Sequence, residues 1–295
     1  MTYLRAVKSY WNCSLDGKKH RLKSPFWLLK NYRWVKALDQ KFDQIGLRDV
    51  LETHGYLYYL FKRLYVFMHK DSRTRIADIN NHQIIDEIVE HYRVLGQHLT
   101  SHQMKKLLQL AGVEFVRETL AEEMEISGHL VFIHRNRREG LSTIELRVNN
   151  QPLYFINFLL SDSQCFIGGV QGAKDSLGLA RMFTQKTQGI PPQRFICFAL
   201  VTLMDKWGIA QVYGVNHHAH VFQGEAKTQY KLDNFNYDDL WTSLEGEVVD
   251  ACWTQLPVPY LRKDLSTVNA KKRGKLKKRY QVLDMFEKKI KNDDL

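Results

Sequence analysis

The chain has 295 residues, of which 44% are hydrophobic and 25% are charged. This composition excludes a globally disordered chain and indicates a globular protein with a sizeable core, in one large domain or two small ones. The formal net charge of +11 is concentrated near the two ends: residues 1–30 carry +6 and residues 271–279 carry +7, which leaves about −2 for the remaining residues.

The N-terminal sequence and the cysteines indicate the cellular compartment of the protein. The opening "MTYLRAVKSYWNCSLDGKKH" has neither the apolar run nor the small-residue cleavage site of a secretory signal. The longest apolar run, Phe195 to Met204, is too short to span a bilayer. We therefore expect a cytoplasmic protein and leave open peripheral contact with the inner membrane. The cysteines form no CxxC pair and are expected to be free thiols, as in a reducing compartment: Cys13, Cys165, Cys197 and Cys252.

Residues 1–125 are predicted to form a helical N-terminal region that includes a basic arm. Apolar residues recur at three- and four-residue spacing over residues 47–69 and 82–99, without an internal proline. A further helix is expected after Thr100 or Ser101, either of which can act as its N-cap.

The pattern changes near Gly128, and residues 126–262 are predicted to form an α/β core. Strands alternate with turn signals first, and helices follow. The expected strands cover residues 129–135, 142–148, 151–161, 164–173, 210–216 and 246–259; the expected helices cover residues 178–187, 189–209 and 237–246, with Asn236 as the cap of the last one. Residues 263–295 add a basic segment and a final amphipathic helix. The fold class is thus α+β: a helical N-terminal region followed by a mixed sheet flanked by helices.

Several stretches together resemble the VirK/YbjX family, a bacterial domain of unknown function. They are "EHYRVLGQHL", "FIGGVQGA", "GIPPQRFICFAL", "GVNHHAHVF", "YDDLWTSLEG" and "KKRYQVLD", spread over roughly residues 85–285. The resemblance implies a link to virulence, to envelope maintenance and to resistance against cationic antimicrobial peptides. It implies no particular reaction.

A second resemblance concerns the fold. A strand, a glycine-containing loop, a helix and then the strand "VYGVN" are similar in order to the acyl-CoA N-acyltransferase (GNAT-like) superfamily. That resemblance implies an acyl- or aminoacyl-transferase in which a helix N-terminus and a strand edge hold the pyrophosphate of coenzyme A. The helix here begins "GIPP", and prolines 191 and 192 cannot donate an N–H. The cofactor is therefore left open between a coenzyme A thioester and none.

The glycine-rich segment is a candidate ligand-binding loop. Glycines allow close approach of a ligand to the backbone, a neighbouring amide can bond a ligand, and a lysine can neutralise a phosphate. The alternative is a bulge and tight turn without a ligand. The candidate cofactor-binding residues are Gly168, Gly169, Gln171, Gly172 and Lys174, and the GNAT-like resemblance adds Asn216.

The histidine cluster after that strand offers a catalytic base. In an extended strand His218 and His220 would share one side and His217 would lie on the other, which is too few ligands for a metal. No HExxH motif is present, so we predict no metal site. His220 and Glu145 are the candidate catalytic residues, because either can accept a proton near neutral pH; the alternative for His220 is a hydrogen bond to a loop.

The basic run before the final helix is a candidate contact for an anionic membrane surface or an envelope component. Its members are Lys271, Lys272, Arg273, Lys275, Lys277, Lys278 and Arg279. The non-enzymatic alternative is a module that docks on anionic lipid or on a partner protein through these charges. Nucleic-acid binding is the remaining alternative, and it rests on charge alone, without a recognition motif.

Overall fold

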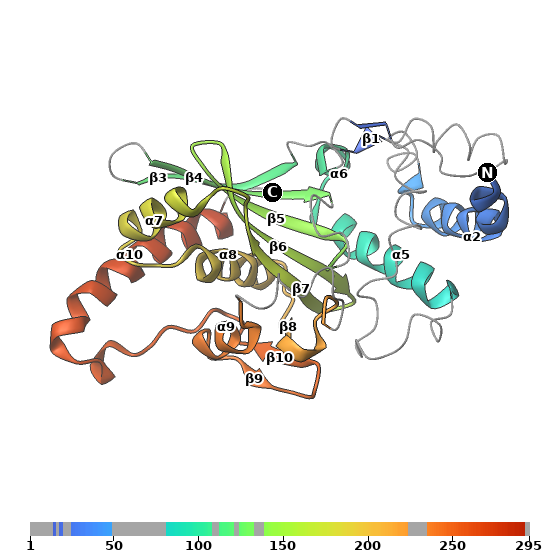
Figure 1. Ribbon diagram of the computed structural model, residues 1–295. Helices are drawn as coiled ribbons and strands as arrows, with labels where there is room; N and C mark the ends of the chain where they lie inside the picture. The colour runs from blue at the N-terminus through green and yellow to red at the C-terminus, as the bar shows by residue number, and fades with distance from the viewer. Residues whose placement is uncertain are drawn as a thin grey trace.

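A computed structural model describes residues 14–15, 18–19, 25–48, 81–107, 112–120, 124–132, 139–223 and 235–292. Its centre is an eight-stranded mixed sheet with the strand order β3-β4-β5-β6-β7-β8-β10-β9. Figure 1 shows α2 (Pro25–Gln44) and α5 (Asn81–His98) toward one end of this sheet and α7 (Leu177–Lys186), α8 (Pro192–Lys206) and α10 (Ala270–Asn292) grouped toward the other. The fold class is confirmed. The helix predicted over residues 47–69 lies almost entirely outside the described residues.

The helices predicted over residues 82–99 and after Thr100 form as α5 and α6, while α2 was not predicted individually. α2 packs on α5, and α5 packs on the sheet at β6. α6 begins with a reciprocal cap: the Thr100 hydroxyl accepts from the Gln103 backbone N–H, and the Gln103 side chain accepts from the Thr100 N–H at 2.8 Å. The bounds are α2 Pro25–Gln44, α5 Asn81–His98 and α6 Ser101–Leu107, preceded by a two-stranded ladder of β1 Ser14–Leu15 and β2 Lys18–Lys19.

The sheet begins at Val113, inside the region predicted to be helical and ahead of the expected boundary at residue 126. Its first five strands form an antiparallel meander, and β8 then pairs parallel to β7. A parallel partner needs a crossover connection, which α7 and α8 supply. The bounds are β3 Val113–Leu120, β4 Met124–Phe132, β5 Ser142–Val148, β6 Gln151–Ser161, β7 Gln164–Gly172, α7 Leu177–Lys186, α8 Pro192–Lys206 and β8 Gln211–Val215.

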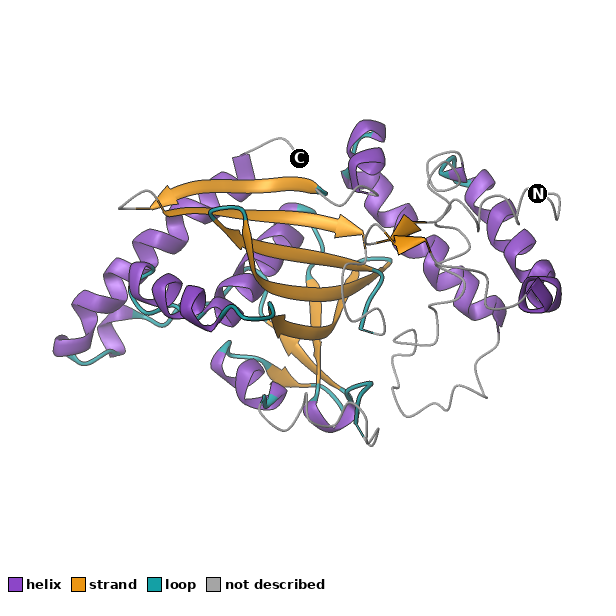
Figure 2. Cartoon of the chain, turned by 45° about the horizontal axis from the view of Figure 1, so that its top comes forward, coloured by secondary structure: helices purple, strands orange, loops and turns teal. Residues whose placement is uncertain are grey.

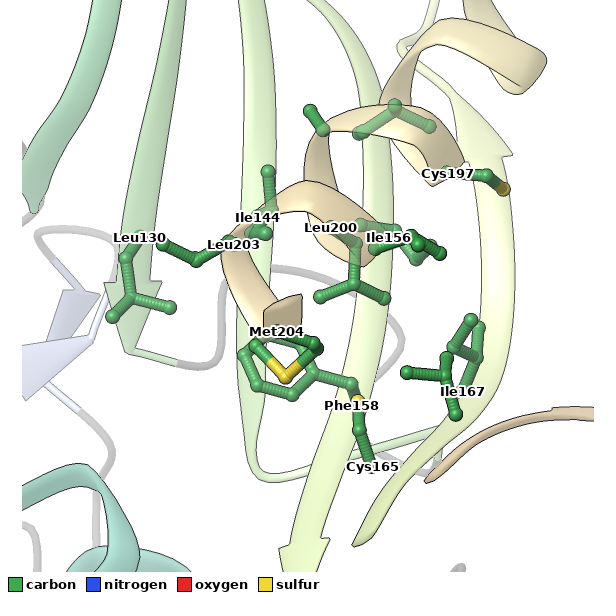
Figure 3. Close-up of a cluster of buried hydrophobic side chains, with 14 of the residues drawn as sticks. Leu130, Ile144, Ile156, Phe158, Cys165, Ile167, Cys197, Leu200, Leu203 and Met204 are labelled. Atoms are coloured by element: carbon green, nitrogen blue, oxygen red, sulfur yellow. The ribbon is translucent and has the colours of Figure 1, made fainter. Parts of the chain in front are cut away.

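The two faces of the sheet differ in chemistry. One face is apolar and is covered by α8, whose Cys197, Leu200, Leu203 and Met204 lie over strand residues such as Ile144 (Figure 3). The opposite face carries buried polar side chains, because residues that alternate with the apolar ones point the other way. These buried polar residues are Ser127, His129, Thr143, Glu145 and Asn157.

The region after β8 corrects one prediction. Residues 246–259 form a hairpin instead of a single strand, because the Asp250 carboxylate accepts from the backbone N–H groups of Cys252 and Trp253 and turns the chain. The cap of the preceding helix is as predicted, since the Asn236 side chain accepts from two backbone N–H groups. The bounds are α9 Tyr237–Ser243, β9 Glu247–Val248 and β10 Trp253–Leu256.

The C-terminal helix α10, Ala270–Asn292, includes the basic run in its first turns. Its C-terminal half packs against α8 through the buried side chains of Leu283, Phe286 and Ile290. Figures 1 and 2 both show the first turns of α10 extending beyond the sheet. Within the described ranges, none of the helices combines the length and the apolar character that a membrane crossing requires.

Candidate functional site

The edge of β7 next to β8 is open over residues 168–172. The parallel pairing of the two strands ends at Ile167 and Gly214, while β7 continues to Gly172. The register with β6 jumps from Ile167 to Gly169, so Gly168 is the extra residue of a β-bulge. A bulge twists its strand away from the regular ladder, and among the described residues β7 has no strand partner on this side beyond the bulge.

Helix α9 closes that open edge. The Val170 backbone N–H donates to the Tyr237 hydroxyl at 3.1 Å, and the hydroxyl points back at the Val170 carbonyl at 3.4 Å. One turn later, the Trp241 indole N–H donates to the Val215 carbonyl at 2.8 Å. Burial together with the nearby charge of Glu139 raises the pKa of Tyr237 well above its usual value, so this hydroxyl stays neutral.

Behind Tyr237 lies a buried carboxylate, Glu139, with 0% of its surface exposed. One oxygen accepts from the Asn157 amide at 2.8 Å, and the other accepts from the Gln171 amide at 2.6 Å. The carboxylate lies directly on Gly169, where a Cβ would come 2.1 Å from its Oε2. Glycine at this position is therefore required by a side chain of the protein itself.

His220 completes this group, with its Nε2 3.6 Å from the Glu139 Oε1. The Phe222 backbone N–H donates to its Nδ1 at 3.2 Å, so the proton of the neutral ring resides on Nε2 and faces the carboxylate. The ring stacks on Tyr237, with centroids 4.8 Å apart. We call Glu139, Asn157, Gln171, His220 and Tyr237 the buried polar centre.

The geometry decides which chemistry these groups can perform. Nδ1 of His220 already accepts from a backbone N–H, so Nε2 carries the proton and faces the Glu139 Oε1 at 3.6 Å, a distance longer than a hydrogen bond. The carboxylate is the stronger candidate for accepting a proton, since its oxygens retain lone pairs after two amide bonds. His220 was predicted to be a base, and that role stays a prediction; in the structure its ring faces Glu139.

A groove of about 900 Å³ opens beside the end of β7. It runs between the β7–α7 loop, α7, the turn before α8 and the basic part of α10. Its lining includes the cations Arg181 and Lys275, the acidic Asp175 and several apolar residues. The apolar and small lining residues are Tyr154, Gly172, Ala173, Leu177, Ala180, Gly189, Pro191 and Pro192.

The predicted ligand loop is therefore a strand for most of its length. Gly168, Gly169 and Gln171 belong to β7, and Gln171 reaches the buried centre. Gly172 lines the groove, which is the part of the prediction that matches a cavity. Lys174 is 85% exposed in its side chain and lies 3.9 Å from Asp175, outside both the groove and the centre.

Asn216 was predicted to contact a cofactor, and its side chain is instead engaged within the fold. Its amide donates to the Asp250 carbonyl at 3.0 Å, and its carbonyl accepts from the Thr254 hydroxyl at 2.6 Å. The residue joins the end of β8 to the β9–β10 hairpin. The next residues, His217–Ala219, form a 3-10 turn, so the predicted alternation of a strand is wrong for His217, His218 and His220.

Glu145, the second candidate base, lies on the same polar face of the sheet but two strands away from β7. It is buried, and Arg147 donates to it at 2.6 Å. An ion pair of this kind with a same-strand arginine holds the carboxylate in place. A catalytic role for Glu145 stays a prediction.

The basic run divides into two sets on α10. Arg279 and Lys275 face the α7–α8 turn, and Arg279 donates to the Gln188 carbonyl at 2.7 Å. Arg273 donates to the Val268 carbonyl at the start of the helix. The other cations are exposed, and among the described residues no carboxylate pairs with them: Lys271, Lys272, Lys277 and Lys278.

Sequence reasoning missed Glu139, Asn157 and Tyr237. Glu139 precedes a strand in a stretch rich in arginine, and it carries no local signal that distinguishes it from a solvated acid. Tyr237 opens "YDDLWTSLEG", a stretch that carries the family resemblance, and that was the available signal. Asn157, an amide inside the apolar run "YFINFLL", was another.

The fold and the buried centre define the class: a mixed-sheet α+β protein with a polar centre at a strand bulge and a groove beside it. The family model described as "Protein of unknown function (DUF535)" matches residues 14–292, and the chain belongs to this family.

Two curated relatives support the membership. The uncharacterized protein YbjX of Escherichia coli K12 is 23% identical over 219 residues, which are 72% of this chain and 66% of that protein. An uncharacterized protein of Haemophilus influenzae is 28% identical over 204 residues, covering 68% of this chain and 67% of its own length. The predicted resemblance to the VirK/YbjX family is confirmed.

Among solved structures, a mutant of the cAMP-binding acyltransferase from Mycobacterium smegmatis is similar over 66% of this chain and 64% of its own. The sequence identity is 10% and the TM-score is 0.28. A superposition this loose carries no argument about function.

Proposed function

We propose that this protein is an enzyme of the acyl- or aminoacyl-transferase type that serves the cell envelope, and that Glu139 accepts the proton of the acceptor amine or hydroxyl. The observation that carries the proposal is the fully buried Glu139, held between two side-chain amides and His220 at the bulge of β7. The envelope role rests on the family resemblance.

The free-energy cost of burying the Glu139 carboxylate supports a functional role for this residue. Burying a carboxylate costs several kcal/mol unless hydrogen bonds and charges compensate it, and an apolar residue would fill the same space more cheaply. Ionisable groups kept in such places cluster at functional sites. The amides of Asn157 and Gln171 orient both oxygens, and each oxygen keeps a lone pair that can accept a proton.

Coenzyme A does not fit in the way that the GNAT-like resemblance implies. The Val170 N–H at the strand edge is bonded to Tyr237. At the helix start, Pro192 has no N–H, and the Arg194 and Phe195 N–H groups both donate to the Pro191 carbonyl. The strand-edge donor is therefore engaged and the prolines at 191 and 192 supply none, so the proposal assigns no step to coenzyme A.

The substitution Glu139→Gln tests the proposal. It retains the shape and removes the charge but sets an NH2 group against one of the two amide donors, so we expect loss of function together with a loss of stability of about 1–3 kcal/mol. The variant and the wild type would be returned to an outer-membrane bacterium that lacks its own family member, and survival in polymyxin would be measured. Glu247→Gln, an exposed change on β9, is the control. Full protection by Glu139→Gln at wild-type protein levels would overturn the proposal.

A thermal-shift measurement tests whether coenzyme A or its thioesters bind as the acyl donor. Coenzyme A, acetyl-CoA and palmitoyl-CoA are each expected to leave the melting temperature unchanged. A ligand that does bind would be detected, because at 100 times its Kd it adds about 2.7 kcal/mol to the free energy of unfolding. Stabilisation by coenzyme A would overturn the argument from the engaged donors while leaving the role of Glu139 to the survival assay.

The second candidate function is docking on an anionic membrane through α10. The exposed lysines at 271, 272, 277 and 278, on turns that extend beyond the sheet, favour it. Each charge near an anionic bilayer contributes about 1 kcal/mol. Co-sedimentation with vesicles of phosphatidylglycerol and phosphatidylcholine, but not with phosphatidylcholine alone, is expected. Equal sedimentation after all four lysines are changed to glutamine would exclude this surface.

A further inference from the structure

A second cavity lies on the other side of the α7–α8 turn and is distinct from the buried polar centre. Its volume is about 290 Å³, and it is walled by α8, α10 and the segment that precedes α10. It shares Gly189 and Pro191 with the groove. Four of its lining side chains are cationic and one is acidic: Arg194, Arg262, Lys263, Arg279 and Glu245.

Two of these cations are balanced within the protein. Arg262 pairs with Asp284 and, at 2.6 Å, with Glu287, while Lys263 lies 3.3 Å from Glu245. These contacts use the carboxylates near the cavity, so neither residue adds net positive charge to it.

Arg194 and Arg279 are the unbalanced pair. Both are half-buried, and each donates to a backbone carbonyl at 2.7 Å, Arg194 to Ser243 and Arg279 to Gln188, while Arg194 also hydrogen-bonds the Tyr260 side chain. In the described part of the chain no carboxylate pairs with either guanidinium. A guanidinium has five N–H donors, so most remain available on two like charges that line one cavity.

We propose that this cavity binds a phosphate group carried on a small organic molecule, with the phosphate held between Arg194 and Arg279. Planar guanidinium groups match phosphate oxygens with paired hydrogen bonds, and an anion between two cations relieves their repulsion. The remaining wall is apolar and aromatic, which suits an organic substituent. It consists of Ile190, Leu276 and Leu283 with the rings of Tyr260 and Tyr280.

The test is calorimetric titration with three probes: inorganic phosphate, glycerol 3-phosphate and dihexanoyl phosphatidic acid. Saturable binding is expected, and Arg194→Gln or Arg279→Gln should weaken it roughly 10- to 100-fold, the effect of losing a charge-assisted bond. Tighter binding of the phosphatidic acid than of glycerol 3-phosphate would assign a lipid head group; equal binding would assign a soluble phosphate.

Lys277→Gln is the matched control, because it removes one charge from the exposed side of the same helix. Arg194→Lys keeps the positive charge but loses the paired N–H donors of the planar guanidinium. It is expected to weaken phosphate binding without affecting folding. Thermal melts would accompany each variant. Absence of saturable binding by the wild type, or equal weakening by Lys277→Gln, would overturn the proposal. Glu139→Gln should bind as the wild type does, so this site stands or falls separately from the proposed reaction.

Discussion

Acidification should weaken this fold through one buried side chain, His91. The residue lies on α5 with none of its surface exposed. Its Nδ1 accepts from the Leu160 backbone N–H at 2.9 Å, and its Nε2 lies 2.8 Å from the Ser142 hydroxyl. The neutral ring thus fastens α5 to both β5 and β6, and a proton on Nδ1 would break the bond to Leu160.

The magnitude follows from the pKa. Burial lowers the pKa of His91 from 6.5 to about 3 in the folded protein. The unfolded chain binds the proton near pH 6.5, so the free energy of unfolding falls as the pH drops below that value toward 3. At 1.36 kcal/mol for each pH unit, the loss between pH 7.5 and pH 5 is about 2 kcal/mol, and about 5 kcal/mol across the whole window.

Urea unfolding at a series of pH values would measure this loss. Other groups titrate too, so the informative quantity is the difference between the wild type and His91→Asn, which cannot titrate at this position. The variant is expected to have a lower free energy of unfolding at pH 7.5, and that free energy is expected to change less with pH than in the wild type. His102→Asn, at an exposed position on α6, controls for histidine removal in general. If the free energies of unfolding of the wild type and His91→Asn fell in parallel between pH 7.5 and pH 5, His91 would not be the source of the acid sensitivity.

Three further changes test the packing around the site and the core, each by urea unfolding. Leu200→Ala, at a fully buried position on α8, should cost about 2–5 kcal/mol, while Leu261→Ala, 54% exposed, should cost little; equal effects would contradict the core assignment. Tyr237→Phe should cost about 1 kcal/mol because it removes the hydroxyl from the edge of β7, and an unchanged midpoint would argue against that bond. Gly169→Ala should cost about 1–3 kcal/mol because its methyl would meet the carboxylate 2.1 Å away, whereas Gly178→Ala meets nothing within 4 Å and should be tolerated.

Much of the fold was predictable from local patterns. The helices α5, α7 and α8 and the central strands follow from apolar periodicity, and the caps at Thr100 and Asn236 follow from side chains that accept backbone N–H groups. Two local signals were misread. The strand β3 was missed before Gly128, and Asp250 turns the chain inside a segment predicted to be one strand.

The candidate site was less predictable, since its parts come from separate segments. Gln171 and His220 were singled out from the sequence, yet what joins them is Glu139, which contacts both. Asn216, predicted to contact a cofactor, lies outside this group. Its side-chain amide bonds to Asp250 and Thr254 of the β9–β10 hairpin.

Most helices and strands, the basic ends and the family could be read from neighbouring residues. Which polar groups share a buried space depends on contacts between distant segments, which the fold alone establishes. The bulge at Gly168 and the end of β8 leave one strand edge open. A carboxylate and an imidazole meet there because hydrogen bonds and exclusion from water act between residues that are far apart in the chain.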